Sequence, residues 1–140
     1  MKILVAADGS RYTKRMLAYL AAHDELLGPQ HQYTVFTGVA PIPSHAAAML
    51  DSDMLQSYYA DEAEAVFKPI RSFLAKQGLK ANFVTKVGAV AEALCKQAKA
   101  GKYDLIVMGN RGHGALGNLV MGSVATKVIA NTDKPVLLVR

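Results

Sequence analysis

The chain of 140 residues lacks the features that mark disulfide-linked and membrane-spanning proteins. Its single cysteine, Cys95, excludes a disulfide framework and a zinc site built from several cysteines, and it fits a reducing compartment. No stretch approaches the roughly 18 apolar residues of a membrane-spanning helix. The first apolar run, Ile3 to Ala7, meets Asp8 too soon for a signal peptide. These absences predict a cytoplasmic protein with no membrane partner.

Clusters of basic residues are also missing, although the formal net charge is +5. The sixteen Lys and Arg residues are scattered along the chain. Aromatic residues do not interleave with them, as they would in a surface that stacks the bases of nucleic acid. A solvated surface with a basic bias therefore explains the charge better than nucleic-acid binding does.

The apolar residues alternate between strand-like and helix-like spacing along the chain. Helical spacing follows Ser10, Asp53 and Gly88, and begins again at Gly122. The expected strands are runs of apolar or β-branched residues, namely Lys2–Ala7, Tyr33–Val39, Asn82–Val87, Asp104–Met108 and Pro135–Val139. This order predicts an α/β fold with one doubly wound, mostly parallel five-stranded sheet and helices on both faces. Residues 1–140 are expected to form a single domain.

Local signals set the expected ends of the helices. Ser10 is a good N-cap for the first helix, and Gly28-Pro29 should end it. The stretch from Pro41 to Asp53 is expected to be irregular. Pro69 lies inside the long second helix, where it should produce a kink or a break.

The segment from Gly109 to Ser123 follows the fourth strand and contains five glycines. In doubly wound sheets, ligands bind beyond the carboxyl ends of the strands, where the strand order reverses. Glycines let backbone N–H groups approach phosphate oxygens, and a helix that begins at Gly122-Ser123 would add the positive end of its dipole. The segment is therefore a candidate phosphate site.

Two well-known phosphate motifs fit this segment poorly. Gly112, Gly114 and Gly117 have the spacing of the dinucleotide fingerprint, but too few residues follow for the required helix, strand and acidic residue. Gly117 to Ser123 resembles the P-loop, whose essential lysine is absent. A third pattern does fit, Gly-x2-Gly-x9-Gly-Ser, at Gly109, Gly112, Gly122 and Ser123.

With this pattern the chain resembles the universal stress protein family, specifically its ATP-binding branch. The resemblance covers almost the whole chain, through Val5–Ser10, Gly88–Leu94, Asp104–Gly109 and Pro135–Val139. It implies a Rossmann-like fold of the adenine nucleotide alpha hydrolase type. It also implies a homodimer that pairs through the last strand, Pro135 to Val139, whose apolar edge would otherwise invite aggregation.

The resemblance further implies a set of nucleotide-binding residues. Asp8 would contact the ribose, the backbone of Val39 would read the adenine, and Gly122 to Val124 would meet the phosphates. Asp8 could instead brace its own turn, and Ser123 could be only a helix cap. The full set of expected contacts is Ala6, Ala7, Asp8, Val39, Met108, Gly109, Arg111, Gly112, Gly122, Ser123 and Val124.

The expected function is that of a homodimeric regulator of a stress response whose state depends on bound ATP. A slow ATPase or self-phosphorylating enzyme is the alternative, with Ser123 as acceptor and Arg111 stabilising charge, although no residue stands out as a catalytic base. An interaction module that needs no nucleotide is a third hypothesis, and the intact glycine pattern argues against it. Mg²⁺ could accompany the nucleotide, but no dedicated set of metal ligands is visible.

Overall fold

A computed structural model describes residues 1–114 and 120–140. Within these residues a single sheet contains five strands, in the order β3-β2-β1-β4-β5, and every neighbouring pair is parallel. The strands are β1 (Lys2–Ala6), β2 (Gln32–Val39), β3 (Ala81–Val87), β4 (Leu105–Gly109) and β5 (Val136–Val139). The predicted doubly wound α/β fold is confirmed.

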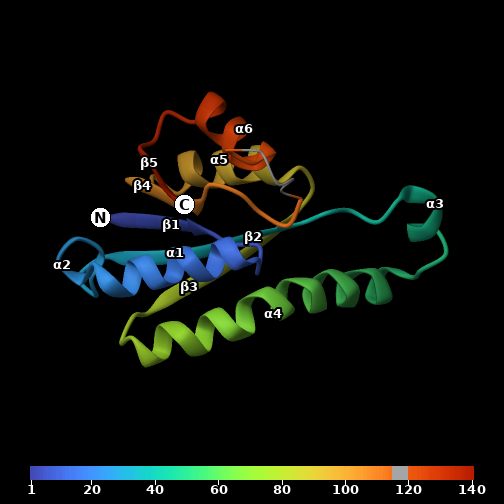
Figure 1. The fold of residues 1–140 in the computed structure, drawn as a ribbon. Coiled ribbons are helices and arrows are strands. Elements are labelled where there is room, and N and C mark those ends of the chain that lie inside the picture. Colours follow the sequence, from blue (N-terminus) through green and yellow to red (C-terminus); the bar gives the residue numbers. More distant parts are fainter. Residues whose placement is uncertain (115–119) are drawn as a thin grey trace.

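Two layers of helices cover the sheet (Figure 1). One face packs against α1 (Arg11–Ala22) and α4 (Ser52–Lys76), and the other against α5 (Val90–Ala100) and α6 (Ser123–Asn131). Successive residues of a strand point to opposite faces. Ile3 accordingly packs in the cluster under α1 and α4, and Leu4 in the cluster under α5 and α6. The continuous apolar runs of the sequence reflect this burial on both faces.

The first helix is shorter than predicted. It ends at Ala22, and a separate short helix, α2 (Asp24–Leu27), precedes Gly28. His23 separates the two with φ −127° and ψ 54°, outside the helical region. Its Nδ1 lies 2.8 Å from the carbonyl oxygen of Tyr19, and its ring stacks on the Tyr19 ring at 4.0 Å between centroids. These local contacts replace the helical bonds that the sequence pattern predicted.

The helix that contains Pro69 begins earlier than expected and is continuous through this proline. The stretch from Pro41 to Asp53 contains a short helix, α3 (Ser44–Ala47), and α4 already begins at Ser52. The carboxylate of Asp51 caps α4 by accepting a hydrogen bond of 2.8 Å from the Met54 N–H. Pro69 does not break α4, because Pro69 lies on the exposed side, where water can satisfy the carbonyl four residues earlier.

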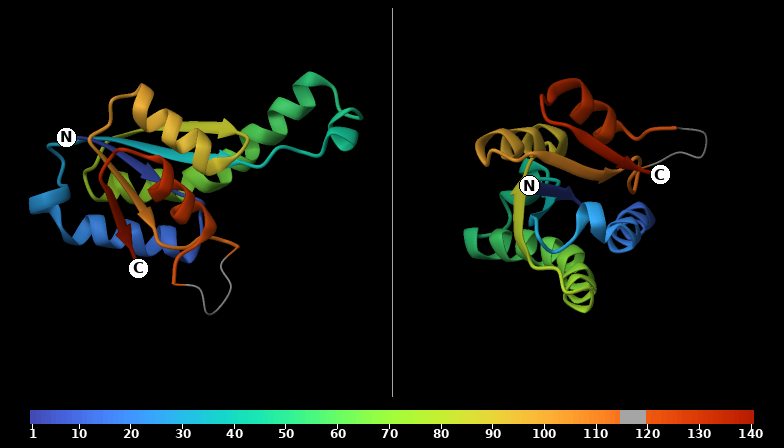
Figure 2. Two further views of the ribbon diagram at one scale, coloured as in Figure 1. Left: turned by 90° about the horizontal axis from the view of Figure 1, so that it is seen from above. Right: turned by 90° about the vertical axis from the view of Figure 1, so that its left-hand side faces the viewer.

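The strand order reverses between β1 and β4. From β1 the chain moves to β2 and β3 on one side, and then crosses to β4 and β5 on the other. The carboxyl ends of both central strands lie at the same edge of the sheet, as Figure 2 shows from above. This is the position at which the sequence predicted a ligand site. Among the described residues, no helix is long and apolar enough to cross a membrane.

Candidate functional site

A cavity of about 330 Å³ opens at this reversal point, between the carboxyl ends of β1 and β4 and the start of α6. Ten of the eleven predicted contact residues line it, and Val39 does not. Gly117, which belonged to the rejected dinucleotide motif, lies outside the described residues. Residues outside the predicted set also line the cavity, and these are Thr13, Phe36, Gly38, Val90, His113, Gly114 and Ala125.

Asp8 stands at the end of β1, and both of its carboxylate oxygens accept hydrogen bonds. Oδ1 accepts from the Ser10 N–H at 2.9 Å and from the Thr13 hydroxyl at 3.0 Å. Oδ2 accepts from the His113 N–H at 3.1 Å. The Asp8 N–H in turn donates to the Thr13 hydroxyl at 3.0 Å. The carboxylate therefore joins β1, the start of α1 and the glycine loop.

The surroundings of Asp8 also set its ionisation. Burial raises the pKa of Asp8, but the hydrogen bonds from Ser10, Thr13 and His113 outweigh this effect and hold the pKa below its ordinary value. Asp8 is consequently ionised at neutral pH and can only accept hydrogen bonds. A ligand hydroxyl suits such a group, and a phosphate does not.

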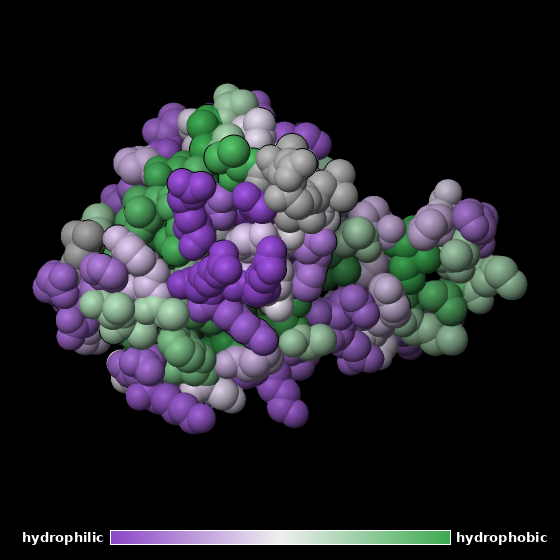
Figure 3. Space-filling model, in the orientation of Figure 1, coloured by the Kyte–Doolittle hydropathy of each residue, from purple (hydrophilic) through white to green (hydrophobic). Residues whose placement is uncertain are grey.

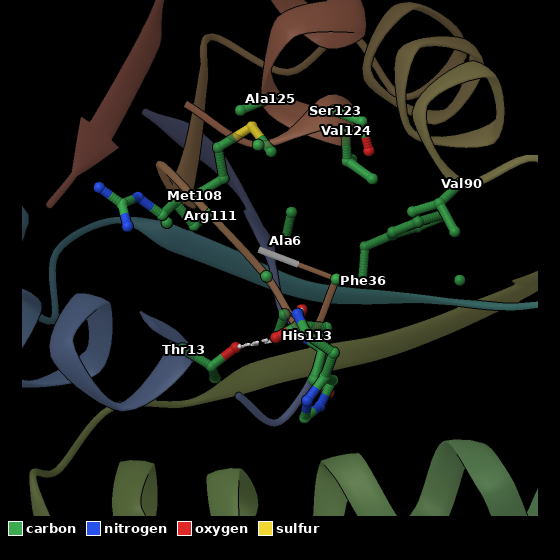
Figure 4. A pocket seen from close by; sticks show the side chains of 17 residues that line it. Ala6, Thr13, Phe36, Val90, Met108, Arg111, His113, Ser123, Val124 and Ala125 are labelled. Atoms are coloured by element: carbon green, nitrogen blue, oxygen red, sulfur yellow. Dashed lines mark hydrogen bonds between the residues drawn. The ribbon is translucent and has the colours of Figure 1, made fainter. Parts of the chain in front are cut away.

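His113 links the glycine loop to β1 a second time. Its Nε2 lies 2.8 Å from the carbonyl oxygen of Asp8, so this nitrogen carries the donated proton. The imidazole is exposed and stands at the cavity wall beside Thr13 in Figure 4. This contact could not be predicted from the position of His113 in the loop, because its partner lies 105 residues earlier in the chain.

The three glycines of the pattern occupy crowded positions. A Cβ on Gly112 would come closer than 3.0 Å to Oδ2 of Asp8. On Gly109 it would lie 2.9 Å from Cβ of Tyr12, and on Gly122 it would lie 3.2 Å from Cα of Arg111. Gly114, by contrast, has no atom of the described residues within 4 Å of that position. The pattern therefore reflects close packing of the loop against β1 and α1.

Asn110 holds the two ends of the loop together. Its carbonyl accepts a hydrogen bond of 2.7 Å from the Gly122 N–H, and its side-chain Nδ2 donates to the Val120 carbonyl at 2.7 Å. Its own N–H donates to the Val139 carbonyl at 3.0 Å. Asn110 is buried, so these bonds are shielded from water. The glycine pattern leaves this position open, and the sequence therefore gave no sign of its importance.

The amino end of α6 faces the cavity. Gly122 is the N-cap and supplies no side-chain cap, and the first turn contains no acidic residue. By helix geometry, the N–H groups of Ser123, Val124 and Ala125 have no partner within α6. All three residues line the cavity. Together with the helix dipole, these donors make this end of the cavity suited to an anion.

Much of the cavity wall is apolar, with side chains from β2, β4 and α5. Phe36, Val90 and Met108 lie around it in Figure 4. Gly38 adds no side chain, since a Cβ there would come within 2.6 Å of Val90 Cγ2. Val39 points to the other face of the sheet and packs in the cluster under α1 and α4. Its carbonyl already accepts a hydrogen bond of 3.0 Å from the Gly88 N–H.

Arg111 lines the cavity, but its guanidinium does not point into it. In Figure 4 its guanidinium points away from the middle of the cavity. Its Cζ lies 5.9 Å from the centroid of the Tyr12 ring, which a cation–π contact allows. In this orientation the guanidinium of Arg111 would not contact a phosphate in the cavity.

No group of three or more His, Cys, Asp or Glu side chains that could hold a metal ion occurs among residues 1–114 and 120–140. The acidic residue nearest to the expected phosphate end is Asp8, whose oxygens are engaged as described.

A parallel doubly wound sheet with a cavity at its reversal point, bordered by a glycine loop and a helix start, defines a Rossmann-like α/β protein. The sequence model of the Universal stress protein family matches residues 1–140, and the chain belongs to this family. It is 34% identical over 139 residues to the universal stress protein encoded in the QAH/OAS sulfhydrylase 3′ region of Thermus aquaticus, covering 99% of this chain and 97% of that protein.

Solved structures agree with this assignment. The structure of the hypothetical protein MJ0577, from Methanocaldococcus jannaschii, superposes with a TM-score of 0.81 at 26% identity and covers 99% of this chain and 94% of that one. The universal stress protein from Archaeoglobus fulgidus, solved in complex with dAMP, has the same fold. Its TM-score is 0.67 at 22% identity, over 100% of this chain and 98% of that chain.

Proposed function

We propose that residues 1–140 act as one ATP-binding domain of the nucleotide-binding branch of the family. The observation that carries this proposal is that one cavity combines an apolar wall with the start of a helix. An apolar wall with Phe36 and Val90 fits an adenine ring, and the start of α6 fits phosphates. The complex of the A. fulgidus protein with dAMP supports an adenine nucleotide as the ligand.

The ligand would lie across the cavity in one direction. Asp8, an ionised acceptor, would take the ribose hydroxyls, with Ala6 and Ala7 beside the base. Gly109 and Gly112 would approach the phosphates from β4, and Ser123 and Val124 from α6. Val39 would contribute only through its backbone, since its side chain belongs to the core. Mg²⁺ would come with the phosphates rather than from a protein cage.

The protein would act as a homodimer through the edge of β5. This strand ends the sheet, so one side of its backbone has no partner within the chain. The Pro135 carbonyl accepts from Ile106 in β4, and the Val139 carbonyl accepts from Asn110, directly after β4. The backbone groups of Val136 and Leu138 are therefore directed outward. A second β5 could pair there, and bound nucleotide beside Asn110 could influence that edge through the Asn110–Val139 bond.

Nucleotide content tests this proposal. Protein purified without added nucleotide is treated with acid, and the released compounds are identified by chromatography. Calorimetric titration with ATP and with AMP then follows for the wild type and for Gly112→Val and Gly122→Val. We expect an adenine nucleotide from the wild type and loss of binding in both variants. A wild type that neither carries nor binds an adenine nucleotide would leave the third hypothesis, an interaction module.

A slow ATPase or self-phosphorylating activity remains the second candidate, because the Ser123 side chain is exposed and lines the anion end of the cavity. Accumulation of ADP over hours in the wild type, lost in Ser123→Ala, would support it. Retained binding without ADP formation would support the regulator.

A further inference from the structure

A long arm projects from the body of the protein. It consists of residues 41–62, which include α3 and the first part of α4 (Figures 1 and 2). No residue of the arm is buried, and the buried positions of α4 begin only at Ala63. The Ile42 N–H donates a hydrogen bond of 2.9 Å to the Tyr59 hydroxyl and so ties the two limbs of the arm together. The arm is thus folded, although among its residues only the partly buried Tyr59 packs against the core.

Large apolar side chains of the arm face solvent. Met49 is 86% exposed, Met54 is 55% exposed and Tyr58 is 44% exposed. Hydrophobic residues gather on the projecting part of the molecule in Figure 3. Met54 and Tyr58 are four residues apart and therefore share one face of α4. An ordered helix face of this kind, rimmed by polar groups, is typical of an interaction site.

The charge of the arm is opposite to that of the rest of the chain. The arm contains Asp51, Asp53, Asp61 and Glu62, all exposed, and no Lys or Arg. The remaining residues contain all sixteen basic residues against seven acidic ones, a balance of +9. The ion pair seen among the described residues joins Arg71 to Glu64, beyond the arm. The four carboxylates of the arm have no cationic partner there.

The exposed face of α4 contains a shallow hollow. Asp53, Met54, Ser57, Tyr58 and Asp61 line it. Asp53, Ser57 and Asp61 are spaced by four residues, which places both carboxylates on the same side as the Tyr58 ring. Carboxylates accept guanidinium in a paired geometry, and an aromatic face attracts it further. The hollow therefore has the chemistry of an arginine-binding surface.

The start of α1 carries exposed basic residues, whose charge is opposite to that of the arm. Arg11, Lys14 and Arg15 are exposed, and the first turn of α1 contains no acidic residue. The guanidinium carbons of Arg11 and Arg15 lie 5.1 Å and 5.6 Å from the Tyr12 ring centroid. This contact holds both side chains against the helix, which lowers the entropy that an interaction would cost. No salt bridge joins this helix to the arm among the described residues.

We propose that the arm of one copy docks on the start of α1 of a second copy. The guanidinium groups of Arg11 and Arg15 enter the hollow between Asp53 and Asp61, and Tyr58 packs against them. A two-fold axis makes the contact reciprocal, so each copy supplies one arm and one α1. This contact uses neither the nucleotide cavity nor the β5 edge, and it stands independently of the proposed function.

A charge exchange between the two surfaces tests the proposal in the full chain. Variant one carries Asp53→Lys and Asp61→Lys, and variant two carries Arg11→Glu and Arg15→Glu. Sedimentation analysis measures the mass of each alone, of their mixture, and of a chain that carries all four changes. Each variant alone should associate at least about tenfold more weakly than the wild type, because like charges then meet. The mixture and the fourfold variant should regain association, because opposite charges meet again at both reciprocal contacts.

Matched controls keep the outcome decisive. Asp24→Lys with Glu25→Lys, and Lys96→Glu with Lys99→Glu, change net charge equally at exposed sites of α2 and α5 and should leave association unchanged. Raising NaCl from about 50 to about 500 mM should weaken the wild-type contact. Circular dichroism confirms folding of every variant. The proposal is overturned if neither variant alters association, if the controls act equally, or if the mixture fails to recover. The β5 contact is tested separately by Val136→Pro, which alters the edge of the sheet and leaves the charges of the arm and of α1 unchanged.

Discussion

Substitution of Gly112 by alanine should separate the role of Asp8 from that of the loop backbone. The new Cβ would come closer than 3.0 Å to Oδ2 of Asp8, a separation that real side chains do not adopt, so the carboxylate must move. That movement breaks the hydrogen bond of 3.1 Å from the His113 N–H. If Asp8 holds the ribose, the displaced carboxylate also loses its hydrogen bond to a ribose hydroxyl. A hydrogen bond to a charged group contributes about 1.5–3 kcal/mol, so the affinity should fall about ten- to a hundredfold.

Gly114→Ala is the matched control, because it adds the same methyl group to the same loop where no atom of residues 1–113 or 120–140 lies within 4 Å. Its affinity should stay within about twofold of the wild type, since no contact changes. The chain contains no tryptophan, so calorimetry with ATP is the appropriate assay, with urea unfolding as the measure of stability. Equal loss in both variants, or wild-type binding in Gly112→Ala, would refute the proposed place of Asp8.

Three further predictions concern other parts of the site and the edge of the sheet. Thr13→Val keeps the shape but removes the hydroxyl that bonds Asp8 twice, and should lower the free energy of unfolding in urea by about 1–3 kcal/mol. Asp8→Asn should lower the free energy of unfolding above pH 3.8, where the carboxyl of the unfolded chain ionises. The difference in free energy between wild type and variant should shrink as the pH falls through the lowered pKa of the folded state. A difference that does not depend on pH would contradict this prediction. Val136→Pro should halve the mass measured by light scattering if β5 edges pair, whereas Val136→Ala, which keeps the N–H, should not.

The fold followed from the sequence because its signals are local and repeated. Each buried strand is an apolar run of the right length, and each helix has its own start or stop residue, as Ser10 illustrates with its side chain accepting from Tyr12 N–H. The errors occurred where a single side chain overrides the pattern. Where α1 ends, His23 contacts Tyr19, and the spacing of apolar residues cannot predict this contact.

The candidate site was predictable where a motif marks it and not where distant segments meet. Gly109, Gly112 and Gly122 belong to one pattern, and the structure gives each of them a crowded position. Thr13 lies in a helix with no sequence motif. Its role became visible only in the structure, where its hydroxyl donates a hydrogen bond to Asp8. Phe36 and Val90 come from elements 54 residues apart in numbering and share the cavity only after folding. The projecting arm could not be predicted from the sequence either, because it depends on how far α4 extends beyond the edge of the sheet.

The direction of a bound nucleotide follows from which groups can donate and which can only accept. Asp8 is held ionised by its hydrogen bonds, so it repels phosphate and attracts hydroxyl groups. The start of α6 presents only donors and attracts phosphate. A nucleotide placed the other way round would bring its phosphates against the apolar wall with Phe36 and Val90 and leave the N–H groups of α6 facing the base. Because the Arg111 charge points away from the cavity, the discrimination against the wrong direction rests on Asp8 and on backbone N–H groups. We infer that the proposed site orients its ligand through the Asp8 carboxylate and the backbone N–H groups at the start of α6, so that its motif needs glycines rather than basic residues.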